Sequence, residues 1–467
     1  MKKSGVICLI LVLLLCITQV SATDNGQNAA LTGGCVSLDS QVPVLGNQRI
    51  VDNADAMVLY ETNTDTLMYA YNADEHIAPA SLVKIMTALI AIENSEMTDV
   101  VTVREAVLAT LPRDALVVDL MVDEVLTVKD LLYCMMVASG NDAAAILADH
   151  VMGSQEAFVA ELNRYAAKLG CTNTYFTDVH GLDDENQYTT ARDVAKMLSC
   201  AIRNEQFCEL FGAVYYTVPA TNKVEARWLS TQNYLLSDDD VQIYYDGRVT
   251  GSRTAISGGK RNIASTAKVG DMNLICIVIG SESVYESDGY TVRVFGGFKE
   301  TKKLLDLGFE GFNAVQILQK GQVLKKSSVS GGSCDVSYGT REDAFSVIPS
   351  NVDSGSLVYR YVDEVVLSAP IEEGTRLSTL QVWCGNICIA QTELYALNGV
   401  PAAVSIIAEN TAAKDRSGFL GVLLYILGAI AVIVLTAVVV LLAIRAVRIA
   451  KVKKHSRRYR RSRRRSR

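Results

Sequence analysis

The 467-residue sequence predicts an α+β protein in which helices are grouped beside an antiparallel sheet, followed by a small all-β domain and one transmembrane helix. Apolar residues recur at helical spacing between residues 78 and 202, whereas residues 241–279 contain short runs typical of strands. Residues 312–404 consist of short alternating runs separated by Gly, Pro and Asn. An uncharged run over 418–444 is long enough to cross a bilayer with some tilt.

The N-terminus has the pattern of a secretory signal peptide. An apolar run over Val6–Ile17 follows two lysines, and the small residues Val20 and Ala22 precede a polar stretch. These small residues disfavour the alternative of an uncleaved anchor. We expect residues 1–22 to be removed after Ala22, and residues 23–48 to form a linker.

The C-terminus predicts a membrane anchor with a basic tail. A linker over 405–417 leads to the uncharged span at 418–444, and residues 445–467 carry 13 Lys and Arg but no acid. The positive-inside rule then places the tail in the cytoplasm and the bulk of the chain outside a bacterial cell membrane. This location argues against a nucleic-acid partner, and an excess of acidic residues over 23–416 agrees with a soluble extracytoplasmic part.

Neither a metal nor a cofactor is expected. The three histidines outside the tail, His76, His150 and His180, have no metal-ligand spacing. Nine cysteines follow the signal peptide without a Cys-x-x-Cys pair, so we interpret most as small buried apolar residues, with a disulfide possible.

The predicted mixed domain, residues 49–311, begins with a hairpin and then a Ser-x-x-Lys pair. Strands over 56–60 and 66–70 precede an apolar helix that contains Ser81 and Lys84. Residues three apart share a helix face, so the amine can reach the hydroxyl. A lysine that is desolvated can lose its proton near neutral pH and activate the serine as a nucleophile.

A second polar group lies in a short loop between two apolar helices. Thr127 and Asp130 have capping-box spacing and start a helix that ends near 136. Ser139 and Asn141 follow it, before a helix over 143–147. By itself this is an ordinary helix connection in which Asn141 is an N-cap.

The rest of this domain continues the α+β pattern. Helices are expected over Gln155–Leu169, from Thr190 to Ile202, and over Phe298–Leu307. Strands are expected over Val241–Thr250 and in a hairpin over 262–279 that turns at Gly270-Asp271. The β-rich domain, 312–404, contains no group of residues that suggests a catalytic or binding site.

Taken together, three motifs resemble the penicillin-binding protein and serine β-lactamase group, which has Ser-x-x-Lys, Ser-x-Asn and Lys-Thr-Gly triplets in one cleft. The chain is most similar to low-molecular-mass D-alanyl-D-alanine carboxypeptidases, which implies their α/β sandwich domain. The segments that carry the resemblance are Ala78–Thr87, Val137–Ala144, His180–Leu182 and Tyr188–Asp193.

The resemblance implies a role for each motif residue. Ser81 would attack the carbonyl between the terminal D-alanines of a peptidoglycan stem peptide, and Lys84 would take its proton. Ser139 would relay a proton to the leaving D-alanine, and Asn141 would hold the substrate amide. Backbone N–H groups of Ser81 and Ser252 would form the oxyanion hole. β-Lactams would be ligands of the same site.

The third motif departs from the family pattern. Its triplet aligns with Val249-Thr250-Gly251, so the cation that would bind the substrate carboxylate is replaced by Val249. Arg248 is adjacent but should point to the opposite face of the strand. Arg253 lies in a loop that is longer than usual and is the other candidate to supply the charge. A lost charge-assisted contact costs about 1.5–3 kcal/mol.

Two other functions stay open. One is a β-lactamase, for which Glu161 is a candidate general base, although it lies on a polar helix face with Arg164 and Lys168. The other is a non-catalytic or impaired wall-binding protein, which the valine at 249 suggests.

Overall fold

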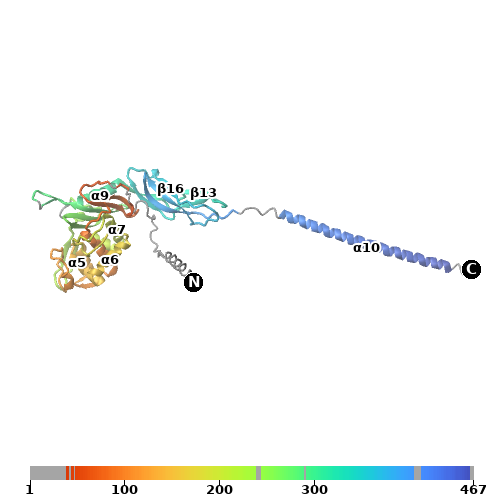
Figure 1. The fold of residues 1–467 in the computed structure, drawn as a ribbon, viewed down its shortest axis with the longest axis horizontal. Coiled ribbons are helices and arrows are strands. Elements are labelled where there is room, and N and C mark those ends of the chain that lie inside the picture. The colour runs from red at the N-terminus through yellow and green to blue at the C-terminus, as the bar shows by residue number, and fades with distance from the viewer. Residues whose placement is uncertain are drawn as a thin grey trace, which may run out of the picture. The chain divides into compact units, whose positions relative to one another are not determined.

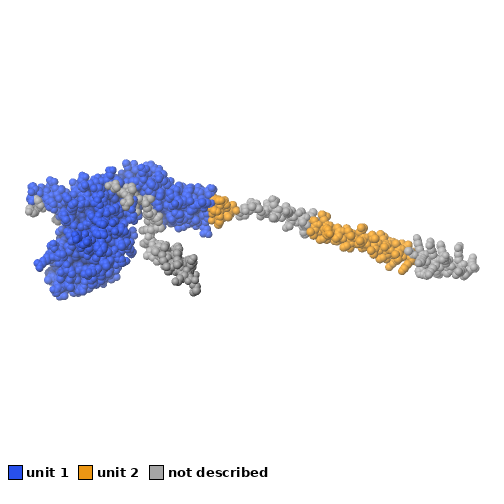
Figure 2. Space-filling view, viewed as in Figure 1, with its two compact units in different colours: residues 1–328, 335–367, 371–399 blue, residues 329–334, 368–370, 400–467 orange. Residues whose placement is uncertain are grey.

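The computed structural model describes residues 38–40, 44–46, 48–237, 243–288, 291–403 and 412–462. The predicted signal peptide, most of the first linker and the end of the basic tail lie outside these residues. Figure 1 shows the elements in chain order, and Figure 2 distinguishes two compact units, which are described separately below.

A five-stranded antiparallel sheet forms the centre of the larger unit, with strand order β2-β1-β9-β8-β7. The strands are β1 (Ala56–Glu61), β2 (Thr66–Tyr71), β7 (Val249–Ser257), β8 (Lys260–Val269) and β9 (Met272–Glu282). The predicted hairpin is confirmed, because Val269 pairs with Met272 across Gly270-Asp271. Strand β7 is at the edge of the sheet, so one side of its backbone is available to a ligand.

The strand predicted over Val241–Thr250 is wrong. Residues 241–242 lie outside the described residues, and β7 begins only at Val249. Asp246 prevents an earlier start, because its carboxylate accepts a hydrogen bond from the backbone N–H of Arg248 at 3.1 Å and its carbonyl accepts one from Val249 at 2.9 Å. The chain therefore turns at 246–249 in the manner of an Asx turn.

Helices cover both faces of this sheet. Alternate β1 residues separate the two faces: Val58 and Tyr60 pack with the helical core, whereas Met57 and Leu59 pack with α9. The first face is covered by η1 (Ala80–Val83), α2 (Lys84–Asn94), α3 (Glu105–Leu108), α4 (Val128–Met136), α5 (Asn141–Met152), α6 (Gln155–Lys168), α7 (Ala191–Ala201) and α8 (Glu205–Phe211). The other face is covered by α9 (Phe298–Gly311).

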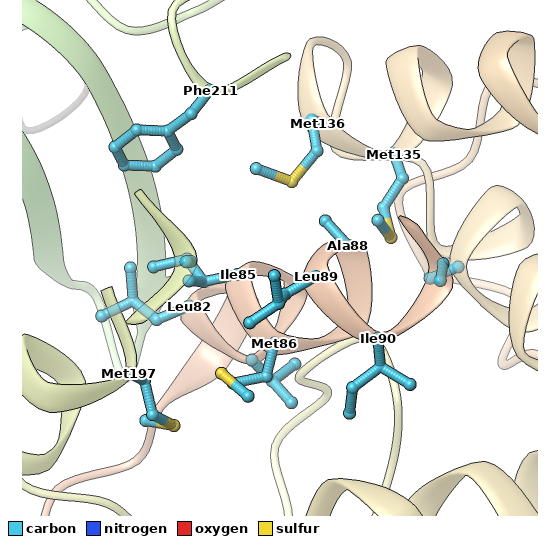
Figure 3. Close-up of a cluster of buried hydrophobic side chains, with 14 of the residues drawn as sticks. Leu82, Ile85, Met86, Ala88, Leu89, Ile90, Met135, Met136, Met197 and Phe211 are labelled. Atoms are coloured by element: carbon cyan, nitrogen blue, oxygen red, sulfur yellow. The ribbon is translucent and has the colours of Figure 1, made fainter. Parts of the chain in front are cut away.

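Helix α2 is at the centre of the helical layer. Figure 3 shows it surrounded by Met135, Met136, Met197 and Phe211, which come from three other helices. Every α2 residue from Lys84 to Ile92 is buried, so the helix is fixed in position by packing. The predicted caps of its neighbours are confirmed: α4 has the Thr127–Asp130 capping box and α7 has Thr190 as N-cap.

Three small hairpins surround the helical layer and sheet. They are β3 (Val100–Thr102) with β4 (Val125–Thr127), β5 (Tyr215–Val218) with β6 (Arg227–Ser230), and β10 (Val284–Tyr285) with β11 (Val292–Val294). The segment after β6 matters for the site, because residues 231–233 follow it directly into the cleft described below.

The remaining strands form the all-β region that the sequence predicts. A two-stranded sheet pairs β12 (Phe312–Leu318) with β15 (Ala344–Pro349), and a five-stranded sheet has the order β13-β14-β18-β17-β16. Its strands are β13 (Lys325–Ser327), β14 (Val336–Gly339), β16 (Val358–Val362), β17 (Arg376–Cys384) and β18 (Ile387–Ala396), with the 3-10 turn η2 (Ser354–Ser356) between β15 and β16.

The second unit contains the C-terminal helix α10 (Ala412–Ser462). The most apolar 18-residue window of its segment Gly421–Ile449 has a mean hydropathy of 3.1, and none of this window is buried by protein. This helix is therefore long and apolar enough to cross a membrane, in agreement with the predicted span.

Candidate active site

Ser81 lies in the 3-10 turn η1, directly before α2, rather than in a regular first helical turn. The turn is held by an unusual backbone contact. Ala80 has a positive φ of 45°, which is strained for a residue with a side chain. Gly181 packs on it so closely that a Cβ there would lie 1.9 Å from the Ala80 carbonyl oxygen. The strained turn therefore fixes where the Ser81 hydroxyl points.

Lys84 is fully buried at the start of α2. Its Nζ lies 2.8 Å from the Ser139 carbonyl oxygen, 2.5 Å from Asn141 Oδ1 and 3.3 Å from Ser139 Oγ. Burial, reinforced by the positive charge of Arg253, holds the pKa of this amine well below its usual value. The neighbouring carboxylates of Asp142 and Asp178 act in the opposite direction on the pKa but do not outweigh burial.

These contacts suit a neutral amine. A neutral –NH2 group has two N–H donors and one lone pair, and two of its three contacts here are to acceptors only, a carbonyl and an amide oxygen. The third contact is to the Ser139 hydroxyl, which can donate. A neutral Lys84 would use its two donors on these two oxygens and leave its lone pair to the Ser139 hydroxyl.

Ser139 connects the amine to the nucleophile. Its Oγ lies 3.5 Å from Ser81 Oγ as well as 3.3 Å from Lys84 Nζ. The residue has a positive φ of 62°, another strained backbone conformation at the site. Within the described residues, no hydrogen bond joins Lys84 to Ser81 directly, so Ser139 is the link between them.

Asn141 and Asp142 hold this loop in place from the first turn of α5. The backbone N–H of Asn141 donates to the Leu116 carbonyl at 2.8 Å. The Asp142 carboxylate accepts from the N–H groups of Val118 and Leu120 at 3.1 Å each. The segment at 116–120 and the Ser-Gly-Asn loop are thereby fixed to each other.

Arg253, on β7, brings a second cation to the same hydroxyl. Its Nη2 donates to Ser139 Oγ at 2.7 Å, its Nη1 to the Met136 carbonyl at 2.7 Å and its Nε to the Ser81 carbonyl at 3.3 Å. The side chain is only 4% exposed, and burial lowers its pKa to about 10. Arg253 therefore remains charged at neutral pH.

The triplet Val249-Thr250-Gly251 does not line the cleft that contains Ser81. Val249 packs against the α9 side of the sheet, and Gly251 packs on Phe211. The Thr250 hydroxyl bonds that of Thr266 at 2.9 Å and lines a separate cavity. This geometry argues against the triplet as the third motif of the cleft. A bulge between Val249 and Gly251 offsets the strand at this point.

Arg248 is also outside the cleft. Its guanidinium donates to Asp246 at 2.6 Å and to Asp306 at 2.5 Å, so its charge is already balanced. These two ion pairs disfavour Arg248 as the cation that compensates for Val249.

The segment Arg253-Thr254-Ala255 occupies the position expected for the third motif. All three residues line the cleft, with a cation first, a threonine second and a small residue third. Ser252 lines it too, but its hydroxyl is occupied by Asn233 at 2.8 Å and Ser265 at 2.7 Å. In the sequence, the signal for this motif is Arg253-Thr254-Ala255, which begins four residues after the start of Val249-Thr250-Gly251.

The cleft between β7 and the helical layer has a volume of about 300 Å³. Besides the residues above, it is lined by Leu116, Met136, Leu182, Asp183, Asn233, Ile256 and Arg261. Glu161, the candidate base of a β-lactamase, does not line it and is paired with Arg164 at 2.5 Å. Among the described residues there is no group of three His, Cys, Asp or Glu side chains placed to hold a metal.

Comparison with known proteins decides the family. A model described as D-alanyl-D-alanine carboxypeptidase matches residues 46–283, and one described as penicillin-binding protein 5, C-terminal domain, matches residues 312–402. The chain belongs to the D-alanyl-D-alanine carboxypeptidase family.

Individual relatives agree with this assignment. The carboxypeptidase DacC of Escherichia coli is 32% identical over 74% of this chain and 84% of its own length. DacF of Bacillus subtilis is 29% identical over 71% of this chain and 82% of its own. The crystal structure of penicillin-binding protein 5 from Haemophilus influenzae has a TM-score of 0.62 and 29% identity over 76% of this chain.

This carboxypeptidase therefore has the penicillin-binding fold that the sequence predicts, and it is a serine hydrolase by family. The prediction of that family from the Ser-x-x-Lys and Ser-x-Asn motifs is confirmed. The residues that line the cleft favour a third motif that starts at Arg253 over one that starts at Val249.

Proposed function

We propose that the cleft binds the D-Ala-D-Ala end of a peptidoglycan stem peptide and that Ser81 Oγ attacks the carbonyl between the two D-alanines. The observation that carries this proposal is the set of contacts at Ser139, where Ser81, Lys84 and Arg253 all meet one hydroxyl at 3.5, 3.3 and 2.7 Å. This arrangement supplies a nucleophile, a base and a fixed positive charge without histidine.

Activation runs through Ser139. As Ser81 Oγ bonds to the carbonyl carbon, its proton passes to Ser139 Oγ, whose own proton passes to the lone pair of Lys84. Arg253 donates to the same oxygen and stabilises the negative charge that develops on it during the transfer. Burial lowers the pKa of this amine well below its usual value, which favours the neutral form that can accept the proton.

The oxyanion that forms on the former carbonyl needs two N–H donors. The family pattern takes one from the nucleophile, Ser81, and one from the residue after the third motif. With the motif at Arg253-Thr254-Ala255, this residue is Ile256 on the edge strand β7, in place of Ser252. Asn141 is then placed to hold the substrate amide, while its Oδ1 also accepts from Lys84.

Collapse of the tetrahedral intermediate releases D-alanine. The C–N bond breaks, and the proton held by Lys84 returns through Ser139 to the leaving nitrogen. Water then attacks the ester on Ser81 and gives up a proton by the same route, which restores the free hydroxyl.

The C-terminal helix supports an extracytoplasmic site. With Gly421–Ile449 across the cell membrane and the basic residues that follow on the cytoplasmic side, the catalytic unit faces the cell wall. The non-catalytic alternative rested on the absence of a cation at the third motif, and the charge of Arg253 at Ser139 argues against it.

D-Alanine release from an N-acylated D-Ala-D-Ala peptide, measured beside the lifetime of a benzylpenicillin adduct by intact mass, tests this function. A carboxypeptidase releases D-alanine and keeps the penicillin adduct for long times. Rapid penicillin turnover would indicate a β-lactamase, and the absence of both adduct and D-alanine would indicate a non-catalytic protein.

A further inference from the structure

The outer face of the hairpin formed by β5 and β6 carries two stacked aromatic rings that have no role in the chemistry above. Tyr215 is 42% exposed and Trp228 is 65% exposed, and their ring centroids lie 5.1 Å apart with 20° between the ring planes. Two hydroxyl side chains complete this face, because Ser230 pairs with Tyr215 and Thr217 pairs with Trp228 across the hairpin. These four residues are named the aromatic platform.

The opposite face of the hairpin is anchored in the helical layer. Tyr216 stacks on Tyr133 at 3.9 Å and donates a hydrogen bond to Asp130 at 2.8 Å. Arg227 donates two hydrogen bonds to the fully buried Glu124, at 2.6 and 2.8 Å. The platform is therefore held in place before any ligand arrives, and a surface that is already ordered loses little conformational entropy on binding.

The platform is continuous with the wall of the cleft. Strand β6 ends at Ser230, and residues 231–233 directly after it line the cleft. Asn233 donates to Ser252 of β7 at 2.8 Å, which fixes this segment to the edge strand. Trp228 precedes the cleft-lining segment by three positions, which is about 10 Å along an extended strand. The two rings are therefore within reach of a ligand that also occupies the cleft.

The chemistry of the platform suits an uncharged ligand that has C–H groups on one face and polar groups at its edge. The face of an aromatic ring is the negative part of its quadrupole, so it attracts the polarised C–H groups of a sugar ring. The hydroxyls of Thr217 and Ser230 are exposed and make no hydrogen bond to other described residues, so they can bind the substituents of that sugar. None of the four side chains is charged, which disfavours anionic lipid head groups as the ligand.

We propose that the aromatic platform binds the amino-sugar strand of peptidoglycan while the attached stem peptide occupies the cleft. This inference rests on the proposed function, because it names the part of the same substrate that lies beyond the peptide. In a pentapeptide stem, four residues separate the sugar from the carbonyl that Ser81 attacks, and four extended residues span up to about 14 Å. A sugar at that distance can reach a platform that begins within three positions of the cleft wall.

The kinetic test compares D-alanine release from two substrates, a disaccharide-pentapeptide prepared from peptidoglycan with a muramidase and the same pentapeptide without sugar. The wild-type kcat/KM should be about 2- to 13-fold higher for the substrate with sugar, the range expected for one aromatic contact. Trp228→Ala should remove most of this preference and leave kcat/KM for the free pentapeptide unchanged. Trp228→Phe should retain part of the preference, because a ring remains.

Trp383→Phe is the control for these variants. It alters the other of the two tryptophans of the chain, which lies in the β domain, and it should keep the full preference for sugar. It also permits a measurement that needs no turnover. In Ser81→Ala combined with Trp383→Phe, Trp228 is the one remaining tryptophan, so its emission should shift to shorter wavelength with the disaccharide-pentapeptide and stay unchanged with the free pentapeptide.

A sugar preference that falls in Trp228→Ala, together with this emission shift, supports the proposal. Equal losses for both substrates in Trp228→Ala, the wild-type preference retained in that variant, or no emission shift with the disaccharide-pentapeptide would each overturn it. An emission shift with vesicles of anionic phospholipid but none with the disaccharide-pentapeptide would assign the rings to a membrane surface instead.

The proposed function can fail independently of this inference. A wild type that releases D-alanine from both substrates at equal kcat/KM would overturn the platform and keep the carboxypeptidase. A wild type that releases D-alanine from neither substrate would overturn the carboxypeptidase, and the emission of Trp228 would then decide whether the platform binds sugar.

Discussion

At the scale of single residues, two buried cationic side chains reach the same hydroxyl, and their ordinary pKa values decide what each can do. Burial lowers the pKa of both Lys84 and Arg253. The pKa of the guanidinium starts from 12.5 and falls only to about 10, so that group stays charged, whereas the pKa of the amine starts from 10.5 and is held well below that value. The site thus obtains a base and a permanent cation from one desolvated environment.

Replacing Arg253 should change both rate and pH dependence. Arg253→Gln removes the cation that donates to Ser139, so acylation by benzylpenicillin should fall about 10- to 150-fold. It also removes a charge that lowers the pKa of Lys84, so that pKa should rise. The neutral amine is lost as pH falls through its pKa, and the acidic limb of the rate profile should therefore move to higher pH. An unshifted limb would show that Arg253 does not act on the amine.

A substitution of Val249 tests whether the third motif begins at Val249 or at Arg253. If the third motif began at Val249, Val249→Lys would restore the missing cation and raise peptide turnover. Because Val249 packs against the α9 side of the sheet and does not line the cleft, we expect no gain in kcat/KM. An increase of tenfold or more, measured as D-alanine release, would contradict this placement.

The residues of the first two motifs could be predicted from the sequence, and those of the third could not. Ser81, Lys84, Ser139 and Asn141 lie at helix starts, where short-range spacing fixes their relative positions. The third motif depends on which strand residues face the cleft. One bulge at 249–251 changes that alternation, and the sequence does not reveal a bulge. Arg261 was also missed, because it reaches the cleft from the neighbouring strand.

At the scale of elements, the nucleophile depends on a glycine that is distant in sequence. Gly181, with φ of 86°, presses on Ala80 and holds the strained turn that precedes Ser81. The helices α2, α4 and α5 bring the side chains of Ser81, Lys84 and Ser139 together, but the contact between Gly181 and Ala80 sets the angle of the turn. The resemblance had marked His180–Leu182 without giving a reason for the glycine, and the contact supplies it.

Gly181→Ala should damage both folding and acylation. Its Cβ would lie 1.9 Å from a backbone oxygen, so η1 must move or the loop must open. Gly153→Ala is a matched control, since Gly153 has φ of 79° and no atom within 4 Å of an added Cβ. The control should lose only about 1–2 kcal/mol from the left-handed backbone. Thermal unfolding and penicillin acylation should show a clearly larger loss for Gly181→Ala; equal losses would exclude the clash.

Most elements of the sheet and the helical layer could be predicted from the sequence, but the start of β7 could not. The hairpin at Gly270-Asp271 and the caps at Thr127 and Thr190 have local sequence signals that the structure confirms. The sequence predicts a strand across the turn at 246–249, because the apolar and aromatic residues before it are typical of one. Asp246 accepts from the backbone of Arg248 and overrides that pattern.

At the scale of the whole molecule, the catalytic unit and the apolar helix are separate parts. Helix α10 carries no charged side chain over residues 421–444, and none of the most apolar window of Gly421–Ile449 is buried by protein. A chain that ends after residue 403 should therefore leave the membrane fraction and keep its penicillin acylation rate. Fractionation with a parallel acylation assay tests this, and a truncated protein that still sediments with membranes would show a second attachment.

The most direct measurement of the central claim is peptide mapping after brief mixing with benzylpenicillin, on the wild-type protein and on Ser81→Ala. The account predicts one penicilloyl group on the peptide that contains Ser81, and no adduct in the variant. A penicilloyl group on another residue, or an adduct of unchanged mass in Ser81→Ala, would contradict the claim that this serine is the nucleophile.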